Sequence, residues 1–186
     1  GGVQLENNGS EDGLIVKYNE NGVVIWAKSF GGNGNDYIAN IAETKSGDYI
    51  VGGYFDGDEI QLETVDNKIV ITNNSKPTTY RDGYIIRYNQ NGEVEGAVSV
   101  GSTGRDEIIT VLATNDGGYI VGGHFDSEIT IGETKLNSNG YRDGMLIKYD
   151  EKGEIEWTKS FGGDITDTLS SIAVIDEGCY IVGGIF

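Results

Sequence analysis

The sequence contains few residues of several types, and each shortage narrows the class of protein. Its one cysteine, Cys179, cannot close an internal disulfide, so the fold does not depend on covalent cross-links. Its one histidine, His124, cannot supply a cluster of histidine metal ligands. No run of about 18 apolar residues occurs, so a membrane-spanning helix is not expected.

Basic residues are also scarce. Thirteen Lys and Arg residues stand against thirty Asp and Glu residues, which gives a formal net charge of −17. Such a charge repels the phosphates of nucleic acids and the head groups of anionic lipids. We therefore expect no nucleic acid partner and no membrane insertion.

Glycine, by contrast, is abundant, with 30 residues in a chain of 186. Tyr, Ile and Val fill short alternating runs and no Gly-X-Y period is present, so the glycines indicate tight turns between strands. No stretch of about a dozen residues keeps the apolar spacing of a helix. The composition predicts a soluble all-β protein with a sizeable core.

Three long segments of the chain align without a gap: residues 12–55, 82–125 and 143–186. Fourteen of the 44 aligned columns are identical in all three segments. The connectors, residues 56–81 and 126–142, differ in length, and residues 1–11 form a partial connector, since residues 5–11 align without a gap with residues 136–142. Constant cores joined by variable loops are typical of stacked repeats, so we expect one repeat domain over residues 1–186.

Each segment predicts four strands separated by glycine-containing turns. In the first segment these are residues 13–18, 24–30, 38–44 and 49–55. The third run is mostly apolar, so we expect it to be innermost and buried on both faces. One sheet would then cross a connector, in the order 38–44, 49–55, 83–88 and 93–100. Each connector also predicts a hairpin: 59–62 with 68–72, and 128–131 with 134–136.

Repeats of this length with four short strands predict a β-propeller of four-stranded antiparallel blades. Three blades are too few for an ordinary ring, because the twist of each sheet fixes how many fill a circle. The chain is therefore expected to be a partial ring or half of a six-bladed homodimer. A third blade would need the carboxy-terminal strand pair to meet the amino-terminal pair. An open solenoid of antiparallel modules is the alternative architecture.

The strings at residues 29–36, 48–53 and 82–88 resemble the bacterial SBBP repeat, a beta-propeller repeat of secreted and surface proteins. All three segments share the resemblance, although Gly101, Ser102 and Ile165 depart from its glycine-rich turn. The kelch repeat is a weaker resemblance, since its spacing fits less cleanly. The SBBP resemblance implies a propeller fold, a bacterial extracellular or cell-surface setting and no enzyme activity.

Acidic residues recur at two columns of the alignment. Residues 31–39 also match a calcium-binding nonapeptide, which makes Asp36 a weak metal candidate, but that site needs copies nine residues apart. A carboxylate repeated in every unit more often accepts hydrogen bonds from turns or from a neighbouring blade. We therefore expect no metal, no cofactor and a structural role for these residues: Asp12, Asp82 and Asp143 in one column, and Asp36, Asp106 and Asp167 in the other.

Single residues add little to a functional assignment. His124 is expected to be a partly exposed strand residue, and Cys179 lies beside a turn, where a nucleophilic role is not expected. Trp26 and Trp157 are expected to pack between blades, whereas Gly96 replaces them in the middle unit, which should pack less well. The connector at 72–81 is polar and adaptable, which makes its residues candidates for ligand binding: Asn73, Asn74, Lys76, Thr78 and Tyr80.

These observations predict a noncatalytic, extracellular bacterial propeller module that binds a protein or glycan or acts as a scaffold. Two alternatives remain open. One is a fragment of a propeller enzyme acting on polysaccharide, which would need asymmetric carboxylates on one face. The other is a purely structural spacer.

Overall fold

The computed structural model describes residues 4–75, 80–176 and 178–186. Within these ranges the chain is all-β, because its short alternating runs favour strands and its glycines and Asn or Asp residues favour turns. The strands are β1 Gly13–Tyr18, β2 Val24–Phe30, β3 Asp36–Glu43, β4 Tyr49–Phe55, β5 Glu59–Glu63, β6 Lys68–Thr72, β7 Asp82–Tyr88, β8 Val94–Val100, β9 Glu107–Ala113, β10 Tyr119–Phe125, β11 Glu128–Ile131, β12 Thr134–Asn137, β13 Asp143–Tyr149, β14 Ile155–Phe161, β15 Thr168–Asp176 and β16 Cys179–Ile185.

Two antiparallel sheets have four strands each, in the orders β3-β4-β7-β8 and β9-β10-β13-β14. Both cross a connector between their second and third strands, as the sequence predicts. The central registers are the same: Tyr49 lies opposite Tyr88 in one sheet, and Tyr119 lies opposite Tyr149 in the other. The strands β1-β2, β5-β6, β11-β12 and β15-β16 form two-stranded sheets. The predicted connector hairpins are thereby confirmed as β5-β6 and β11-β12.

The hairpins that join β1 to β2, β7 to β8 and β13 to β14 use one turn chemistry. In the first, the amide of Gly22 donates to the carbonyl of Asn19, and the Asn19 side chain accepts from the amides of Asn21 and Val23. Gly22 has a φ of 74°, a conformation that costs glycine little and other residues more. The sequence therefore fixes where these strand pairs reverse.

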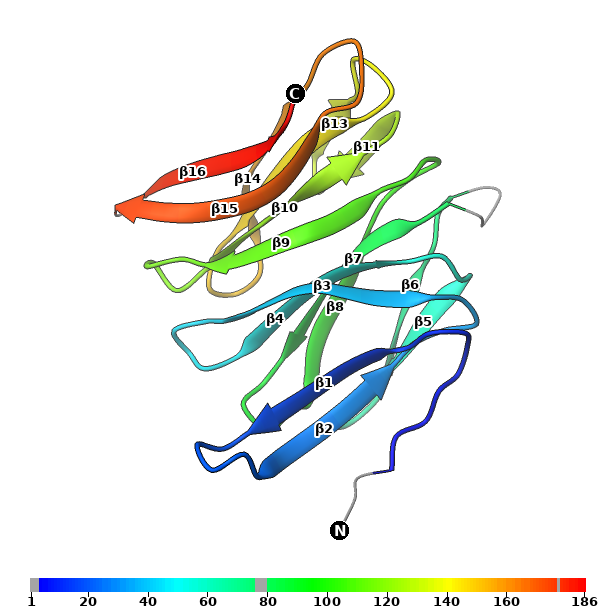
Figure 1. Cartoon of the computed structure of the whole chain (residues 1–186), viewed down its shortest axis with the longest axis vertical. Helices are drawn as coiled ribbons and strands as arrows, with labels where there is room; N and C mark the ends of the chain where they lie inside the picture. The colour runs from blue at the N-terminus through cyan, green and yellow to red at the C-terminus, as the bar shows by residue number, and fades with distance from the viewer. Residues whose placement is uncertain (1–3, 76–79, 177) are drawn as a thin grey trace.

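The sheets stack face to face along the long axis of the molecule (Figure 1). β1-β2 lies at one end and β15-β16 at the other (Figure 1). The two pairs therefore do not meet, the third four-stranded sheet is not formed, and the described residues make an open stack instead of a closed ring. The predicted contact between β1-β2 and β15-β16 is absent among the described residues, because the two four-stranded sheets lie between these pairs.

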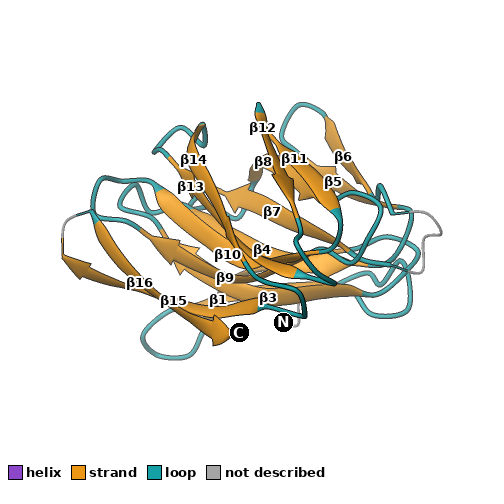
Figure 2. Ribbon diagram, turned by 90° about the horizontal axis from the view of Figure 1, so that it is seen from above, coloured by secondary structure: helices purple, strands orange, loops and turns teal. Residues whose placement is uncertain are grey.

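The stack is closest on the side of the first strand of each sheet. There β9 contacts β3 and β4 of one neighbour and β15 of the other. On the opposite side, hairpin strands lie against the last strands, with β6 contacting β8 and β12 contacting β14. Figure 2, which looks along the stack, shows both hairpins projecting on the side away from β3 and β9. The sheets are thus wedged apart on one side and converge on the other.

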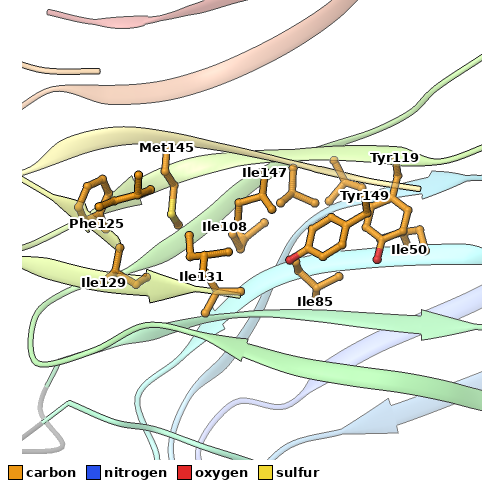
Figure 3. Close-up of a cluster of buried hydrophobic side chains, with 14 residues drawn as sticks. Ile50, Ile85, Ile108, Tyr119, Phe125, Ile129, Ile131, Met145, Ile147 and Tyr149 are labelled. Carbon is orange, nitrogen blue, oxygen red and sulfur yellow. The ribbon is translucent and has the colours of Figure 1, made fainter. Parts of the chain in front are cut away.

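The core lies between the sheets and under the hairpins. One cluster joins Ile108 of β9, Phe125 of β10 and Met145 of β13 to Ile129 and Ile131 of the β11-β12 hairpin (Figure 3). A second cluster fills the preceding junction in the same way, with Ile60 and Leu62 from the β5-β6 hairpin. Each hairpin therefore contributes to the core and is not merely a solvated insertion.

Burial of the first strands follows their place in the stack. β9 is largely buried because it has a sheet on both sides, as predicted for the innermost run. In β3 after Asp36, and in β15 apart from Leu169, the residues are half-buried or exposed, so the prediction of burial on both faces is wrong for these two strands. The difference arises because the face of β3 away from β9 meets only the two-stranded β1-β2 pair.

Candidate functional site

The first column of repeated aspartates anchors the connectors. Asp12 accepts a hydrogen bond from the amide of Asn8 at 2.7 Å, and Asp82 accepts one from the amide of Asn74 at 2.7 Å. Asp143 accepts from the amide of Asn139 at 3.2 Å. The three carboxylates thus bind the chain that leads into their own strands.

The second column holds the turns that precede the first strands. Asp36 accepts from the amide of Gly32 at 2.9 Å, and Asp106 accepts from the amide of Ser102 at 2.8 Å. Asp167 accepts from the amide of Gly163 at 2.7 Å. Burial raises the pKa of Asp36 to about 6 and that of Asp106 to about 7, because a buried carboxylate loses its hydration. In the described ranges, no group of three or more His, Cys, Asp or Glu side chains could hold a metal ion.

The connector residues predicted to bind a ligand do not all face solvent. Asn73 is buried, and its side chain donates to the carbonyl of Tyr80 and accepts from the amide of Ser75. The side chain of Asn74 donates to Asp82, whereas Tyr80 is exposed. Lys76 and Thr78 lie outside the described residues. Asn73 and Asn74 therefore hold the base of this loop.

A different set of side chains gathers where β3, β4, β9 and β10 meet the connectors. Arg81, just before β7, lies over two aromatic rings of the neighbouring strands: its guanidinium carbon is 4.8 Å from the ring centre of Tyr54 and 5.4 Å from that of Tyr37. The carbonyl of Arg81 accepts from the amide of Asp106 at 2.7 Å, which fixes the backbone there. The planar guanidinium is held in place by cation–π contacts.

Arg81 also reaches Glu107, the first residue of β9. Glu107 Oε1 accepts from Arg81 at 3.2 Å and from Arg105 Nε at 2.6 Å. Glu107 Oε2 lies 3.4 Å from Nε2 of His124 on the paired strand β10. The buried carboxylate is thus shared by two arginines, which compensates the cost of burying its charge, while the imidazole of His124 lies near its second oxygen.

His124 is 6% exposed, so the prediction of a partly exposed residue is wrong. Its side chain turns inward because β10 lies second in its sheet with a neighbouring sheet on each face. Burial lowers the pKa of His124 to about 4; Glu107 opposes this shift, and Arg142 and Arg105 add to it. The imidazole is therefore neutral at pH 7, and within the described part of the chain neither ring nitrogen has a hydrogen-bond partner.

Arg142, just before β13, extends the same set. Its Nε donates to Asp126 Oδ1 at 2.9 Å, and its backbone carbonyl accepts from Asp167, as that of Arg81 accepts from Asp106. We call this set the arginine row: Tyr37, Tyr54, Arg81, Arg105, Glu107, His124, Asp126 and Arg142. Among the described residues, the terminal nitrogens of Arg105 and Arg142 have no hydrogen-bond partner, and both side chains are partly exposed.

The arginine row contains three of the four arginines in the chain. The sequence analysis did not predict the arginine row, because it considered the alignment columns that are identical in all units and not those that differ. Three variable columns meet here: Glu11, Arg81 and Arg142; Tyr37, Glu107 and Thr168; and Tyr54, His124 and Ile185. At these aligned positions the side chain changes between acidic, basic and uncharged from one unit to the next, and this variation could have indicated the site.

A groove of about 1240 Å³ lies between β2, the β5-β6 hairpin and the start of β8. Leu5, Leu62 and Val65 give it apolar wall, while Glu59 and Glu63 contribute carboxylates. Lys28 is the one lysine among the described residues that line the groove, and several carboxylates lie beside it, so the groove is unsuited to an anionic ligand. It is a second candidate binding surface with different chemistry.

The remaining singled-out residues have ordinary surroundings. Trp26 packs edge-on to Tyr49 with ring centres 5.8 Å apart, and its Nε1 donates to the carbonyl of Gln90. Trp157 similarly lies 6.4 Å from Tyr180. Both tryptophans therefore contact a neighbouring sheet. Cys179 is an exposed free thiol.

Fold and site together define an all-β protein of stacked antiparallel sheets with an asymmetric cluster of charge at one edge of the stack. No helix in the described residues is long and apolar enough to cross a membrane. No family model matches the chain. It is similar to the Regulatory protein FlaEY of Caulobacter vibrioides, with 26% identity over 180 residues. The match covers 95% of this chain and 18% of that relative, so the chain spans less than a fifth of its length.

Proposed function

We propose that this chain is a noncatalytic binding module, built as part of a β-propeller, whose arginine row takes a carboxylate of an acidic glycan. The observation that carries the proposal is the gathering of three arginines in an otherwise strongly acidic protein. Arginine presents a planar fork that matches a carboxylate. The row holds three guanidinium groups and the two carboxylates of Glu107 and Asp126.

The partly exposed ends of Arg105 and Arg142 are the groups available to a ligand. Each arginine uses Nε to hold a protein carboxylate, which orients the remaining two nitrogens. A guanidinium already fixed in this way loses less conformational entropy on binding than a mobile lysine. Tyr37 and Tyr54, partly exposed beside Arg81, add aromatic surface of the kind that packs against sugar rings.

Wedge-shaped stacking supports the propeller. The sheets converge at β3, β9 and β15 and are held apart by hairpins at β8 and β14, as blades around an axis would be. A solenoid would stack its modules without a shared side of convergence. The three units would then be a partial ring or half of a six-bladed homodimer.

The chemistry of the row favours binding over catalysis. Glu107 and His124 are asymmetric, as an enzyme fragment acting on polysaccharide would require, but both side chains are buried. Glu107 is also held by two arginines, so its carboxylate is not positioned to attack or protonate a bound sugar. A purely structural spacer would need no such cluster.

A bacterial extracellular or cell-surface location is part of the proposal. The resemblance to SBBP repeats supports it, and the similarity to a bacterial protein named as regulatory, not as an enzyme, supports a noncatalytic role. A protein ligand carrying clustered carboxylates is the alternative partner for the same arginines.

Calorimetric titration with oligogalacturonate tests the proposal, and the methyl-esterified oligomer is the matched neutral ligand. We expect binding only to the free acid, weakened by salt because charge is involved. Arg105→Gln should lower affinity about tenfold, the loss of about one charge-assisted hydrogen bond, while Lys152→Gln, an equal charge change on an exposed turn, should not. Equal binding of both oligomers, or none, would refute a uronate ligand; binding of an acidic peptide instead would assign the row to a protein partner.

A further inference from the structure

An aspartate follows the second strand of each four-stranded sheet, Asp56 after β4 and Asp126 after β10, and the two hold different groups. Asp56 Oδ1 accepts from the backbone amide of Asn35 at 2.8 Å, and Oδ2 accepts from the side-chain nitrogen of the same residue at 2.9 Å. Both oxygens are thus used within one unit. Asp56 therefore serves the turn that leads into β3.

In the second unit the aligned aspartate divides its two oxygens between two units. Asp126 Oδ2 accepts from the backbone amide of Arg105 at 3.1 Å, whereas Oδ1 accepts from Nε of Arg142 at 2.9 Å. Arg105 stands where the first unit has Asn35, and its side chain reaches Glu107 instead of returning to the aspartate. Arginine at this position therefore adds a guanidinium to the row and leaves one carboxylate oxygen free to bind the arginine of the next unit.

Asp126 is itself held in place by the turn on which it lies. Its backbone amide donates to Asp106 Oδ1 at 3.0 Å. A Cβ at Gly104 would lie 2.4 Å from the Cβ of Asp126, so the glycine lets the aspartate approach the turn that carries Arg105. The side chains of Asp126 and Arg142 are only 23% and 20% exposed, so their ion pair is partly shielded from water.

We propose that Asp126 is the positioning residue of the arginine row: it holds Arg142 by Nε, so that the two terminal nitrogens face the ligand carboxylate, and it fixes the turn from which Arg105 projects. The guanidinium groups of both arginines lie close enough to His124 to lower its pKa, so they gather in the same part of the row. This inference rests on the proposed function, because Asp126 acts on the ligand only through the arginines.

The sign of the effect on binding separates positioning from charge. A carboxylate beside an anion-binding site repels the ligand, so removing its charge alone should strengthen binding. Removing a carboxylate that orients an arginine should instead weaken binding. Asparagine ends in one acceptor oxygen and one donor nitrogen, so at position 126 it can keep only one of the two bonds that Asp126 accepts. Asp126→Asn should lower the affinity for oligogalacturonate about fivefold, since Arg142 must then be ordered when the ligand binds.

Nitrogen-15 NMR of the arginine side chains tests the orientation without a ligand. The chain has four arginines, so four Nε–H resonances are expected. Exchange of the Arg142 Nε–H with water should be about tenfold faster in Asp126→Asn, through loss of one charge-assisted hydrogen bond, whereas that of Arg87, paired with Glu95 at 3.2 Å, should not change. Asp56→Asn, an equal charge change at the aligned turn, should leave all four rates unchanged. An unchanged rate for Arg142 in Asp126→Asn would overturn the inference whatever the ligand does.

Calorimetric titration with oligogalacturonate then tests the link to binding. Asp56→Asn loses the same charge and a comparable turn bond as Asp126→Asn, so a general loss of stability should be common to both, but Asp56→Asn should not weaken binding. In the background of Arg142→Gln, Asp126→Asn should weaken binding no further, because asparagine can then keep the bond to the Arg105 amide.

The outcomes distinguish this inference from the proposed function. Binding by the wild type together with unchanged or tighter binding by Asp126→Asn would overturn the inference alone. A wild type that does not bind the oligomer would refute the proposed function and this inference with it, even where the exchange of Arg142 behaves as expected.

Discussion

Buried, uncharged His124 should make this protein sensitive to acid. Its pKa in the folded chain is about 4, against an ordinary value of 6.5, mainly because burial disfavours the imidazolium. Below pH 6.5 the imidazole is protonated in the unfolded chain, whereas in the folded chain it stays neutral until the pH nears 4. The stability supplied by this group is therefore complete above pH 6.5 and falls as the pH drops toward 4.

The size of the loss follows from the interval between the two pKa values. Each pH unit between them costs about 1.4 kcal/mol, so roughly 2 kcal/mol should be lost between pH 7 and pH 4.5. The range stops at 4.5 because the sequence pI is about 4.2, where solubility falls. His124→Gln removes the titrating group and with it this component of the pH dependence.

Urea unfolding at several pH values measures the effect as the difference between wild type and His124→Gln. Other titrating groups cancel in this difference, since they are present in both proteins. His124→Tyr is a second variant, which introduces the residue found at the aligned position Tyr54 of the first unit. Its stability should depend on pH in the same way as that of His124→Gln. A difference constant within about 0.5 kcal/mol from pH 7 to 4.5, or a histidine resonance that titrates near 6.5, would refute the reasoning.

Three further predictions concern other positions in the sheets and their turns. Asp106 has a pKa of about 7 in the folded chain, against an ordinary value of 3.8. Its protonation therefore stabilises the folded state at low pH, and this stabilisation is lost as the pH rises through 7. In the same unfolding assay, Asp106→Asn should remove roughly 3 kcal/mol of the change in unfolding free energy between pH 5 and 8. Gly123→Ala should destabilise the fold by roughly 3 kcal/mol, because its Cβ would overlap the carbonyl oxygen of Glu107. Gly96→Ala, with no atom within 4 Å of its Cβ, should instead stabilise the chain by about 0.5 kcal/mol; loss of stability there, measured by thermal melting, would contradict this account.

Strand order was accessible from the sequence because local patterns and the alignment agree. Runs such as Tyr49–Phe55 and Asp82–Tyr88 alternate or are apolar throughout, and they recur at the same spacing, so their pairing across a connector could be predicted. The hairpins at β5-β6 and β11-β12 were likewise visible as alternating pairs. Local periodicity carries this information directly.

Placement of side chains in the arginine row was not accessible in the same way. Arg81, Glu107 and His124 are far apart in sequence, and their contact depends on how the connectors return to the sheet edges. The exposure of His124 was misjudged because strand alternation does not reveal which faces a neighbouring sheet covers. Such contacts are set by tertiary packing, which no single strand encodes.

Both junctions between consecutive units use the same strand pairing in the same register, and this has a consequence for the evolution of such chains. Duplication or loss of a whole unit by recombination would leave every remaining junction chemically unchanged. Copy number can therefore drift while each contact between neighbours stays under the same selection. Innovation is then confined to the columns that differ between units, which is where Arg81, Glu107 and His124 are found.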